Sequence, residues 1–232
     1  MSEKKEKILK LAGKLSLDLK DPEVFENAFV HRSYLNEHPK FYLDNNERLE
    51  FLGDAVLELV TTRYLYDKFQ KPEGELTALR SALVRGKNLS EVAKGLGVEE
   101  CLYLSSGEAQ GAQKAKSLIL ANALEAIIGS IYLDLGYESA RSFIENNILK
   151  LTDKIIDEKL YIDAKSSFQE KVQEKFKVTP QYKVLEQSGP DHNKEFTSAV
   201  FLAEELVATG KGSSKNSAEQ EAAKAALEKL FS

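Results

Sequence analysis

The chain has 232 residues, of which 42% are hydrophobic and 30% charged, and its formal net charge is −5. This composition suits one large or two smaller globular domains and excludes a disordered chain or a protein built of membrane spans. The negative charge excludes nucleic-acid binding through bulk positive charge, and the single cysteine, Cys101, excludes an internal disulfide and a cysteine-based zinc cage.

The N-terminal residues are charged and periodic, so we expect no signal peptide there, and we expect no run elsewhere that is long enough to cross a bilayer. Cys101 lies in an apolar patch, where we expect it to fill the core. A lone thiol of this kind is typical of a reducing compartment, so the sequence predicts a cytoplasmic protein.

Residues from about 4 to 157 follow a helical pattern, and no stretch before residue 160 alternates for long enough to form a strand. The pattern predicts a helix over 25–35, a long helix over 46–69, and two helices within 73–97 that are separated at 86–88 and end at Gly97. A basic loop should then lead into an apolar helix that ends near residue 136, with further helices over 137–160. The sequence therefore predicts a mainly α domain over residues 1–157.

After a linker at 158–163, the pattern changes to a helix, three strands and a helix. The helices are expected over 164–176 and 214–231, and the strands within 179–191, 194–203 and 205–212. Ser217 and Gln220 are spaced as a capping box for the last helix. This order predicts a small α+β domain over 164–232, with two helices on one face of an antiparallel sheet.

A stripe of carboxylates interrupts the predicted helix over 46–69. At about 100° per residue, Glu47, Glu50 and Asp54 fall within an arc of about 60°, while apolar residues cover most of the remaining circumference. A helix of that kind is usually buried, and buried carboxylates need a cationic side chain or a metal ion as partner. The alternative is an ordinary amphipathic helix whose acidic side faces water.

A second polar pair lies in the predicted apolar helix. Asn122 and Glu125 are the only strongly polar side chains between residues 118 and 129, and their spacing places them on one face. If the two helices face each other, four oxygen donors meet, namely Glu50, Asp54, Asn122 and Glu125. Hard oxygen donors with no His or Cys nearby select Mg²⁺ or Mn²⁺ over zinc, and these ions commonly act on phosphate esters.

The C-terminal region carries polar groups suited to RNA. Lys211 and Lys215 lie beside a helix N-terminus, where the helix dipole and the lysines together favour phosphate. His192 is on a turn between strands, and the first helix carries Ser166, Gln169 and Glu170. Groups on a helix, a loop and a helix N-terminus could span successive grooves of A-form RNA. The alternatives are a solvated turn histidine and lysines that serve solubility.

Several stretches resemble bacterial ribonuclease III, and the resemblance covers essentially the whole chain. The N-terminal stretches are "HRSYLNE", "NERLEFLGDAVLELV", "EGELTALRSALV" and "LILANALEAIIGSIYLD". In the C-terminal region, "GPDH" and "SKNSAEQEAAKAAL" resemble the double-stranded RNA-binding domain of that family.

The resemblance implies a homodimeric, Mg²⁺-dependent endonuclease that cuts double-stranded RNA and leaves 5′-phosphate and 3′-hydroxyl ends with short 3′ overhangs. Mn²⁺ would substitute for Mg²⁺, and no membrane or small-molecule cofactor is expected. The implied role is the processing of ribosomal RNA precursors and other structured transcripts.

The resemblance also assigns roles to residues. Glu50, Asp54 and Glu125 match the metal-binding and catalytic acids of the family, and the last two match the pair that carries the chemistry. Glu47 and Glu75 match acids associated with the cleavage site, and Phe51 matches an aromatic residue that plugs the partner subunit. In the C-terminal domain, the positions that match RNA contacts are Ser166, Gln169, Glu170, His192, Lys215 and Asn216.

Two positions depart from the family pattern, which usually has aspartate at position 122 and commonly lysine at position 216, where this chain has Asn122 and Asn216. An amide oxygen can still bind a hard cation, but it has no charge and offers only one oxygen. The chain could be a natural variant that still cuts RNA, a deliberate substitution that leaves an inactive enzyme, or a natural protein that only binds RNA duplexes. We favour the active variant because every other acid is present, which also argues against a purely structural role on ribosomal RNA.

Overall fold

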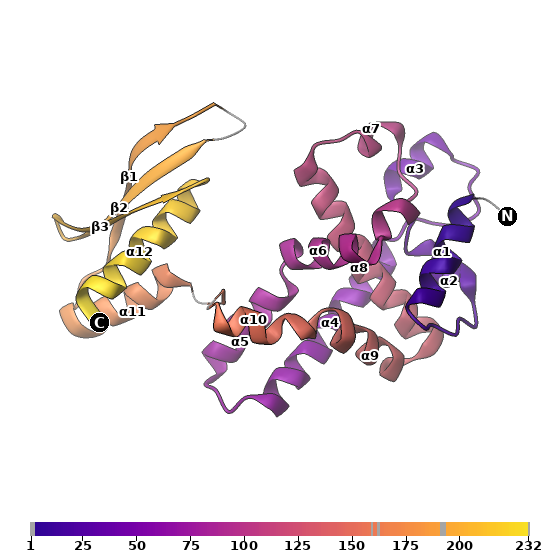
Figure 1. The fold of residues 1–232 in the computed structure, drawn as a ribbon, viewed down its shortest axis with the longest axis horizontal. Coiled ribbons are helices and arrows are strands. Elements are labelled where there is room, and N and C mark those ends of the chain that lie inside the picture. The colour runs from indigo at the N-terminus through magenta and orange to yellow at the C-terminus, as the bar shows by residue number, and fades with distance from the viewer. Residues whose placement is uncertain (1–2, 159, 162, 191–193, 232) are drawn as a thin grey trace. The chain divides into compact units, whose positions relative to one another are not determined.

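The computed structural model describes residues 3–158, 160–161, 163–190 and 194–231. The chain divides into two compact units, residues 1–161 and 162–232, which are drawn in Figure 1. The last helix of the first unit ends at Asp157, and the first helix of the second unit begins at Ala164. The linker predicted at 158–163 spans this division, and two of its residues, 159 and 162, lie outside the described residues.

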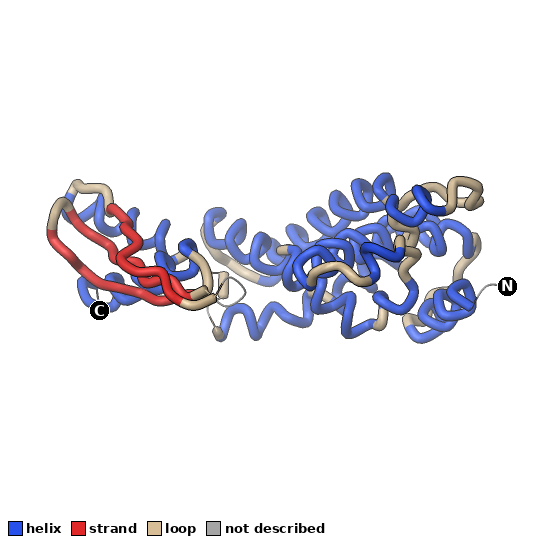
Figure 2. The backbone as a smooth tube through the Cα atoms, turned by 90° about the horizontal axis from the view of Figure 1, so that it is seen from above, coloured by secondary structure: helices blue, strands red, loops and turns tan. Residues whose placement is uncertain are grey.

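The first unit consists of helices and loops, as Figure 2 shows. Its α-helices are α1 (Glu3–Lys14), α2 (Pro22–Asn27), α3 (Arg32–Glu37), α4 (Glu47–Lys68), α5 (Glu73–Val84), α6 (Gly86–Leu96), α7 (Ser106–Ala109), α8 (Gln113–Leu135), α9 (Tyr137–Asn147) and α10 (Thr152–Asp157). Two short 3₁₀ helices complete the unit, η1 (Val98–Cys101) and η2 (Leu149–Leu151). The prediction of a mainly α domain is therefore confirmed.

Helix α8 forms the centre of the first unit. It packs against α4 and α6, and most of its side chains from Ile119 to Ile131 are buried. Within the described part of the chain, it is the one helix that is long and apolar enough to cross a bilayer. The expectation that no run reaches that length was therefore wrong, because a helix surrounded by other helices needs apolar side chains on all sides. Cys101 is buried as expected, and burial raises the pKa of its thiol.

Helices α4 and α8 cross with their backbones in direct contact. A Cβ atom added to Gly53 would lie 1.7 Å from the backbone oxygen of Glu125, and one added to Gly129 would lie 2.2 Å from the backbone oxygen of Leu49. Because no side chain fits at either position, both glycines are needed for this approach. The contact places Glu125 directly opposite the acidic segment of α4.

The helix predicted over 25–35 is interrupted. Helix α2 ends at Asn27, and Val30 forms an isolated parallel bridge with Tyr103 before α3 begins. His31 is therefore the N-cap of α3, where its Nδ1 accepts from the backbone N–H of Ser33, and not the middle of a helix. Because Val30 and Tyr103 are far apart in the sequence, no local pattern of residues could predict this bridge.

Two further boundaries differ from the predictions. The break within 73–97 lies at Arg85, and Gly86 already begins α6. Lys114 and Lys116 lie in the first turn of α8, where a loop was expected. The end of α6 at Gly97 is confirmed, because this residue has a φ of +84°, which glycine adopts without strain.

The second unit is a three-stranded antiparallel sheet with two helices on one face, as predicted (Figure 2). Its elements are α11 (Ala164–Phe176), β1 (Gln181–Ser188), β2 (Glu195–Leu202), β3 (Glu205–Gly212) and α12 (Lys215–Phe231). The strands are ordered β1-β2-β3, with Tyr182 paired to Val200 and Val200 paired to Ala208. Val200 shares a core with Phe168 of α11 and Ala222 of α12, so the sheet is covered on that side.

The capping box predicted for α12 does not form. Instead, Oγ of Ser214 accepts from the backbone N–H of Ser217 at 3.1 Å. The side chain of Gln220 bonds to Asp163 and Lys165 of α11. The local prediction was wrong because α12 already begins at Lys215, so that Ser214 caps the helix and Ser217 lies inside it.

Replacing Gly53 with alanine should destabilise the chain by about 3 kcal/mol, because the new methyl group would overlap the backbone of α8. The free energy of unfolding in denaturant measures this change. The matched control is Gly95→Ala, inside α6, where nothing lies within 4 Å of an added Cβ. That variant should be unchanged or more stable by about 0.5–1 kcal/mol, and equal stability of the two variants would contradict the close contact.

Candidate functional site

Three carboxylates and one amide lie around the crossing of α4 and α8. Glu50 and Asp54 are one turn apart on α4, and Asn122 and Glu125 are nearly one turn apart on α8. Glu50, Asn122 and Glu125 are partly buried, whereas Asp54 is exposed. We call these four residues the acidic cluster; it is open to solvent on the side of Asp54.

Two carboxylates of the acidic cluster, Glu50 and Glu125, have raised pKa values. Burial, and then the negative charges of Asp54 and Glu50, raise the pKa of Glu125 to about 7. Burial also raises the pKa of Glu50; a hydrogen bond with Asn122 opposes that shift, and the charges of Glu47 and Asp54 add to it. Side chains from both helices therefore share one negatively charged site.

The donors of the acidic cluster suit a hard divalent cation. All four side chains present oxygen, the ligand atom that Mg²⁺ and Mn²⁺ prefer. A cation bound among these side chains would attract the carboxylates. This attraction would offset their mutual repulsion, which contributes to the raised pKa of Glu125. Among the described residues, no three His, Cys, Asp or Glu side chains are gathered closely enough to hold a metal ion as they stand. The side chains would therefore have to close around the ion.

The two flanking acids predicted for this site lie in different places. Glu47, in the first turn of α4, is exposed, and its carboxylate oxygen lies 3.7 Å from a guanidinium nitrogen of Arg32. The charge of Glu47 also contributes to the raised pKa of Glu50. Glu75, on α5, forms an ion pair in which its carboxylate oxygen lies 2.7 Å from Nζ of Lys71. The structure thus places Glu47 beside the acidic cluster and does not bring Glu75 to it within one chain.

An apolar stripe runs along the exposed side of α4. Phe51, Leu59 and Tyr66 are 80%, 58% and 70% exposed, and they fall within an arc of about 80°. The prediction that this helix is buried nearly all round is therefore wrong for the single chain. Helical spacing could have identified this second stripe, which we call the α4 stripe, but spacing does not distinguish a core from a subunit interface.

Part of the predicted RNA surface lies on α11. Four exposed residues line a shallow hollow of about 290 Å³, namely Ser166, Gln169, Glu170 and Gln173. Gln173 was not predicted, although its spacing of one turn from Gln169 could have identified it. We call this depression the α11 hollow; its polar lining suits hydroxyl and phosphate groups.

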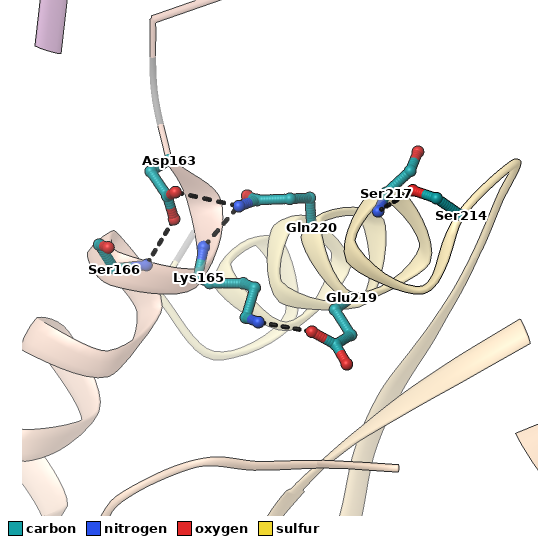
Figure 3. Close-up of polar contacts among 7 residues, drawn as sticks. All are labelled: Asp163, Lys165, Ser166, Ser214, Ser217, Glu219 and Gln220. Atoms are coloured by element: carbon teal, nitrogen blue, oxygen red, sulfur yellow. Dashed lines mark hydrogen bonds and ion pairs between the residues drawn. The ribbon is translucent and has the colours of Figure 1, made fainter. Parts of the chain in front are cut away.

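The other part lies near the N-terminus of α12. Lys215 and Asn216 are exposed in its first turn, and Lys211 is exposed on β3, where its Nζ lies 3.3 Å from a carboxylate oxygen of Glu195. His192 lies outside the described residues. Figure 3 shows the first turn of α11 joined by hydrogen bonds to Gln220, in the second turn of α12, so the two parts are adjacent.

Comparisons with known proteins agree with both units. Residues 21–152 match the family model described as Ribonuclease-III-like, and residues 164–230 match the double-stranded RNA binding motif. The chain is 40% identical to ribonuclease 3 of Treponema denticola over 230 residues, which cover 99% of this chain and 93% of that protein. It is 43% identical to ribonuclease 3 of Carboxydothermus hydrogenoformans over 227 residues, which cover 97% of each chain.

A solved structure agrees with the first unit. The nuclease domain of ribonuclease III from Campylobacter jejuni superposes with a TM-score of 0.54 and 41% identity, covering 60% of this chain and 97% of that one. That structure is described as showing flexibility in a region involved in dimer formation of the nuclease domain. Two matched domains in the same order, together with relatives that extend over nearly the full length, confirm the resemblance: the chain belongs to the ribonuclease III family of double-strand-specific endoribonucleases.

Proposed function

We propose that this protein cuts RNA duplexes with Mg²⁺ bound between α4 and α8, and that Mn²⁺ can take its place. The products are 5′-phosphate and 3′-hydroxyl ends with short 3′ overhangs, and the substrates are ribosomal RNA precursors and other structured transcripts in the cytoplasm. The observation that carries the proposal is the raised pKa of Glu125 and of Glu50, which burial and neighbouring carboxylates, Asp54 among them, cause at the helix contact. Carboxylates crowded in this way need a cation, and divalent ions are widely used for phosphodiester hydrolysis.

The acidic cluster would orient the reacting groups. A divalent cation bound there supplies hydroxide from water and stabilises charge on the departing 3′ oxygen. Asp54, exposed at the opening, and Glu125, partly buried, hold the attacking water in line with the scissile phosphate. Glu50 and Asn122 form the other side of the site, where the amide supplies an oxygen without adding a charge.

The proposal extends to a homodimer held by the α4 stripe. An aromatic side chain that is 80% exposed, as Phe51 is, becomes favourable when a partner covers it. A second copy of the chain would supply that cover, and the similarity to a nuclease domain described as having a region for dimer formation supports this. Two copies would bring two acidic clusters to one RNA duplex, one for each strand.

The second unit would hold the duplex by its shape. The deep groove of A-form RNA hides the base edges, so a protein reads hydroxyl and phosphate groups instead. The α11 hollow provides polar side chains for this purpose, and Lys215 at the N-terminus of α12 provides a positive site for phosphate. Cleavage would therefore depend on duplex structure more than on base sequence.

A protein that binds RNA duplexes without cutting them is the alternative, and Asn122 favours it. The amide bonds to Glu50 and leaves the acidic cluster with three ionisable groups. The two functions differ in one gel assay, in which the chain is incubated with a long RNA duplex and Mg²⁺. Discrete fragments support the enzyme, and retarded duplex without fragments supports the alternative.

Glu125→Gln should slow duplex cleavage by about 100-fold or more and leave RNA affinity within about twofold, because the change alters the acidic cluster and not the RNA-binding unit. Single-turnover rates in Mg²⁺ and filter binding in EDTA measure the two quantities. Glu91→Gln, on the exposed side of α6, is the control that removes an equal charge. Joint loss of cutting and binding would contradict these separate roles.

Asn122→Asp should lower the Mg²⁺ concentration for half-maximal cleavage by about tenfold, because a charged oxygen replaces a neutral one. In EDTA the same variant should melt at a lower temperature, because a fourth carboxylate joins the cluster without a cation. Asn146→Asp, exposed on α9, is the control. If Asn122→Asp cuts the duplex and the unaltered chain does not, this result would establish the alternative function, that of a protein that binds RNA duplexes without cutting them.

Phe51→Ala should raise the dissociation constant of the dimer by about 30-fold or more, because it removes the most exposed large side chain of the α4 stripe. Its effect on the unfolding midpoint of the single chain should be small, since Phe51 is 80% exposed. Sedimentation at several concentrations measures the constant, and Leu185→Ala, exposed on β1, is the control. An unaltered chain that sediments as a monomer at all concentrations would rule out this interface.

A further inference from the structure

A network of side chains joins the N-terminal turns of α11 and α12 (Figure 3). Asp163 is the N-cap of α11, and one of its carboxylate oxygens accepts from the backbone N–H of Ser166 at 2.8 Å. The other oxygen accepts from the amide nitrogen of Gln220 at 3.1 Å, and the amide oxygen of Gln220 accepts from the backbone N–H of Lys165 at 3.3 Å. One side chain of α12 therefore completes the capping of α11.

A second connection lies beside the first. The Nζ atom of Lys165 pairs with the carboxylate of Glu219 and lies 4.8 Å from the ring centre of Tyr182 on β1. The hydroxyl of Tyr182 is buried without a hydrogen-bond partner among the described residues, and burial, then Glu219 and Asp163, raise its pKa to about 12. We call Asp163, Lys165, Glu219 and Gln220 the helix link.

The helix link lies where the two parts of the predicted RNA surface meet. Ser166, whose backbone N–H is capped by Asp163, is also the first of the residues that line the α11 hollow. Lys215 begins α12 little more than one turn before Gln220. A duplex that contacts both parts requires a fixed separation between them, because its phosphates and grooves are regularly spaced.

The hydrophobic core reaches the first turn of α11 through one small side chain, that of Ala164. Phe168 and Val172 share a core with Ala222 and Ala226, which all lie farther along the two helices. The side chain of Ser166 is exposed. Capping by Asp163 and Gln220 therefore acts together with the contact of Ala164 to set the direction of the first turn.

We infer that Gln220 is a positioning residue for RNA binding. Its two hydrogen bonds set the first turn of α11 relative to the N-terminus of α12, so that the α11 hollow and Lys215 contact one duplex together. The residue itself does not contact RNA. This inference rests on the proposed RNA-binding function of the second unit.

A carboxyl group at this position tests the network through pH. In Gln220→Glu, the new group faces Asp163 and Lys165 of α11, Glu219 of its own helix and the hydroxyl of Tyr182 on β1. At pH 8 it is ionised and repels Asp163, so the full chain should bind a duplex about tenfold more weakly than the unaltered chain. At pH 5 the neighbouring acids favour its protonated form, which donates to Asp163 and accepts from Lys165, and the difference should close to about twofold.

The control for the added charge is Gln181→Glu, at an exposed position of β1. Its affinity should be close to that of the unaltered chain at both pH values, with all binding measured in EDTA to prevent cutting. A Gln220→Glu variant that follows this control at both pH values would overturn the inference. Failure of the unaltered chain to bind the duplex would instead remove the proposed function, and the inference with it.

Gln220→Ala separates positioning from folding. It removes both hydrogen bonds without adding charge, so the KM for duplex cleavage should rise about threefold to tenfold while kcat stays the same. The assay is run well below the unfolding midpoint of the variant. A merely structural role would reduce the active fraction, and therefore kcat, without raising KM, and that result would overturn the inference.

Discussion

The contact between the backbones of α4 and α8 is the constraint on which the proposed nuclease site depends. Packed helices usually lie about 8–10 Å apart, because side chains separate them. Gly53 and Gly129 remove those side chains at the crossing, so Glu125 can share a small volume with the carboxylates of α4. A larger residue at either glycine would separate the charges, and the weaker repulsion between them would leave less reason for a cation to bind.

The same closeness makes the acidic cluster unfavourable without a cation. Burial, and then neighbouring charges, raise the pKa of Glu125 and Glu50, so folding of the cation-free chain works against both the desolvation and the repulsion of these carboxylates. Functional sites often retain local conflicts of this kind. Asn122 reduces the conflict, because its amide bonds to Glu50 and adds no fourth charge. Relative to an aspartate, it favours the stability of the cation-free chain over affinity for the cation.

Helical spacing alone identified the acids of α4 and α8, because each group interrupts an apolar helix. Their close approach was not predictable, since a glycine inside a helix looks the same in sequence whether it admits another backbone, as Gly53 does, or faces open space, as Gly95 does. On the exposed side of α4, the resemblance assigned Phe51 to a partner subunit, but Leu59 and Tyr66 were missed because an apolar stripe looks the same whether a core or a subunit covers it. The interruption before His31 depends on a bridge between segments far apart in the chain.

In the second unit, two helix N-termini lie close together and their charges must be compensated. The N-terminal turns of α11 and α12 both carry partial positive charge, and they lie side by side. The carboxylates of Asp163 and Glu219 lie between these turns and stabilise the two helix N-termini. They also bring negative charge near the surface that is proposed to bind phosphates. Gln220 donates to the first carboxylate and Lys165 to the second, so both carboxylates are engaged within the helix link, to which Lys215 does not belong. The local pattern predicted that Gln220 would cap its own helix, and in that case the N-terminal turns of α11 and α12 would lack this connection. Because Gln220 bonds to α11 instead, the two turns are joined into one continuous surface.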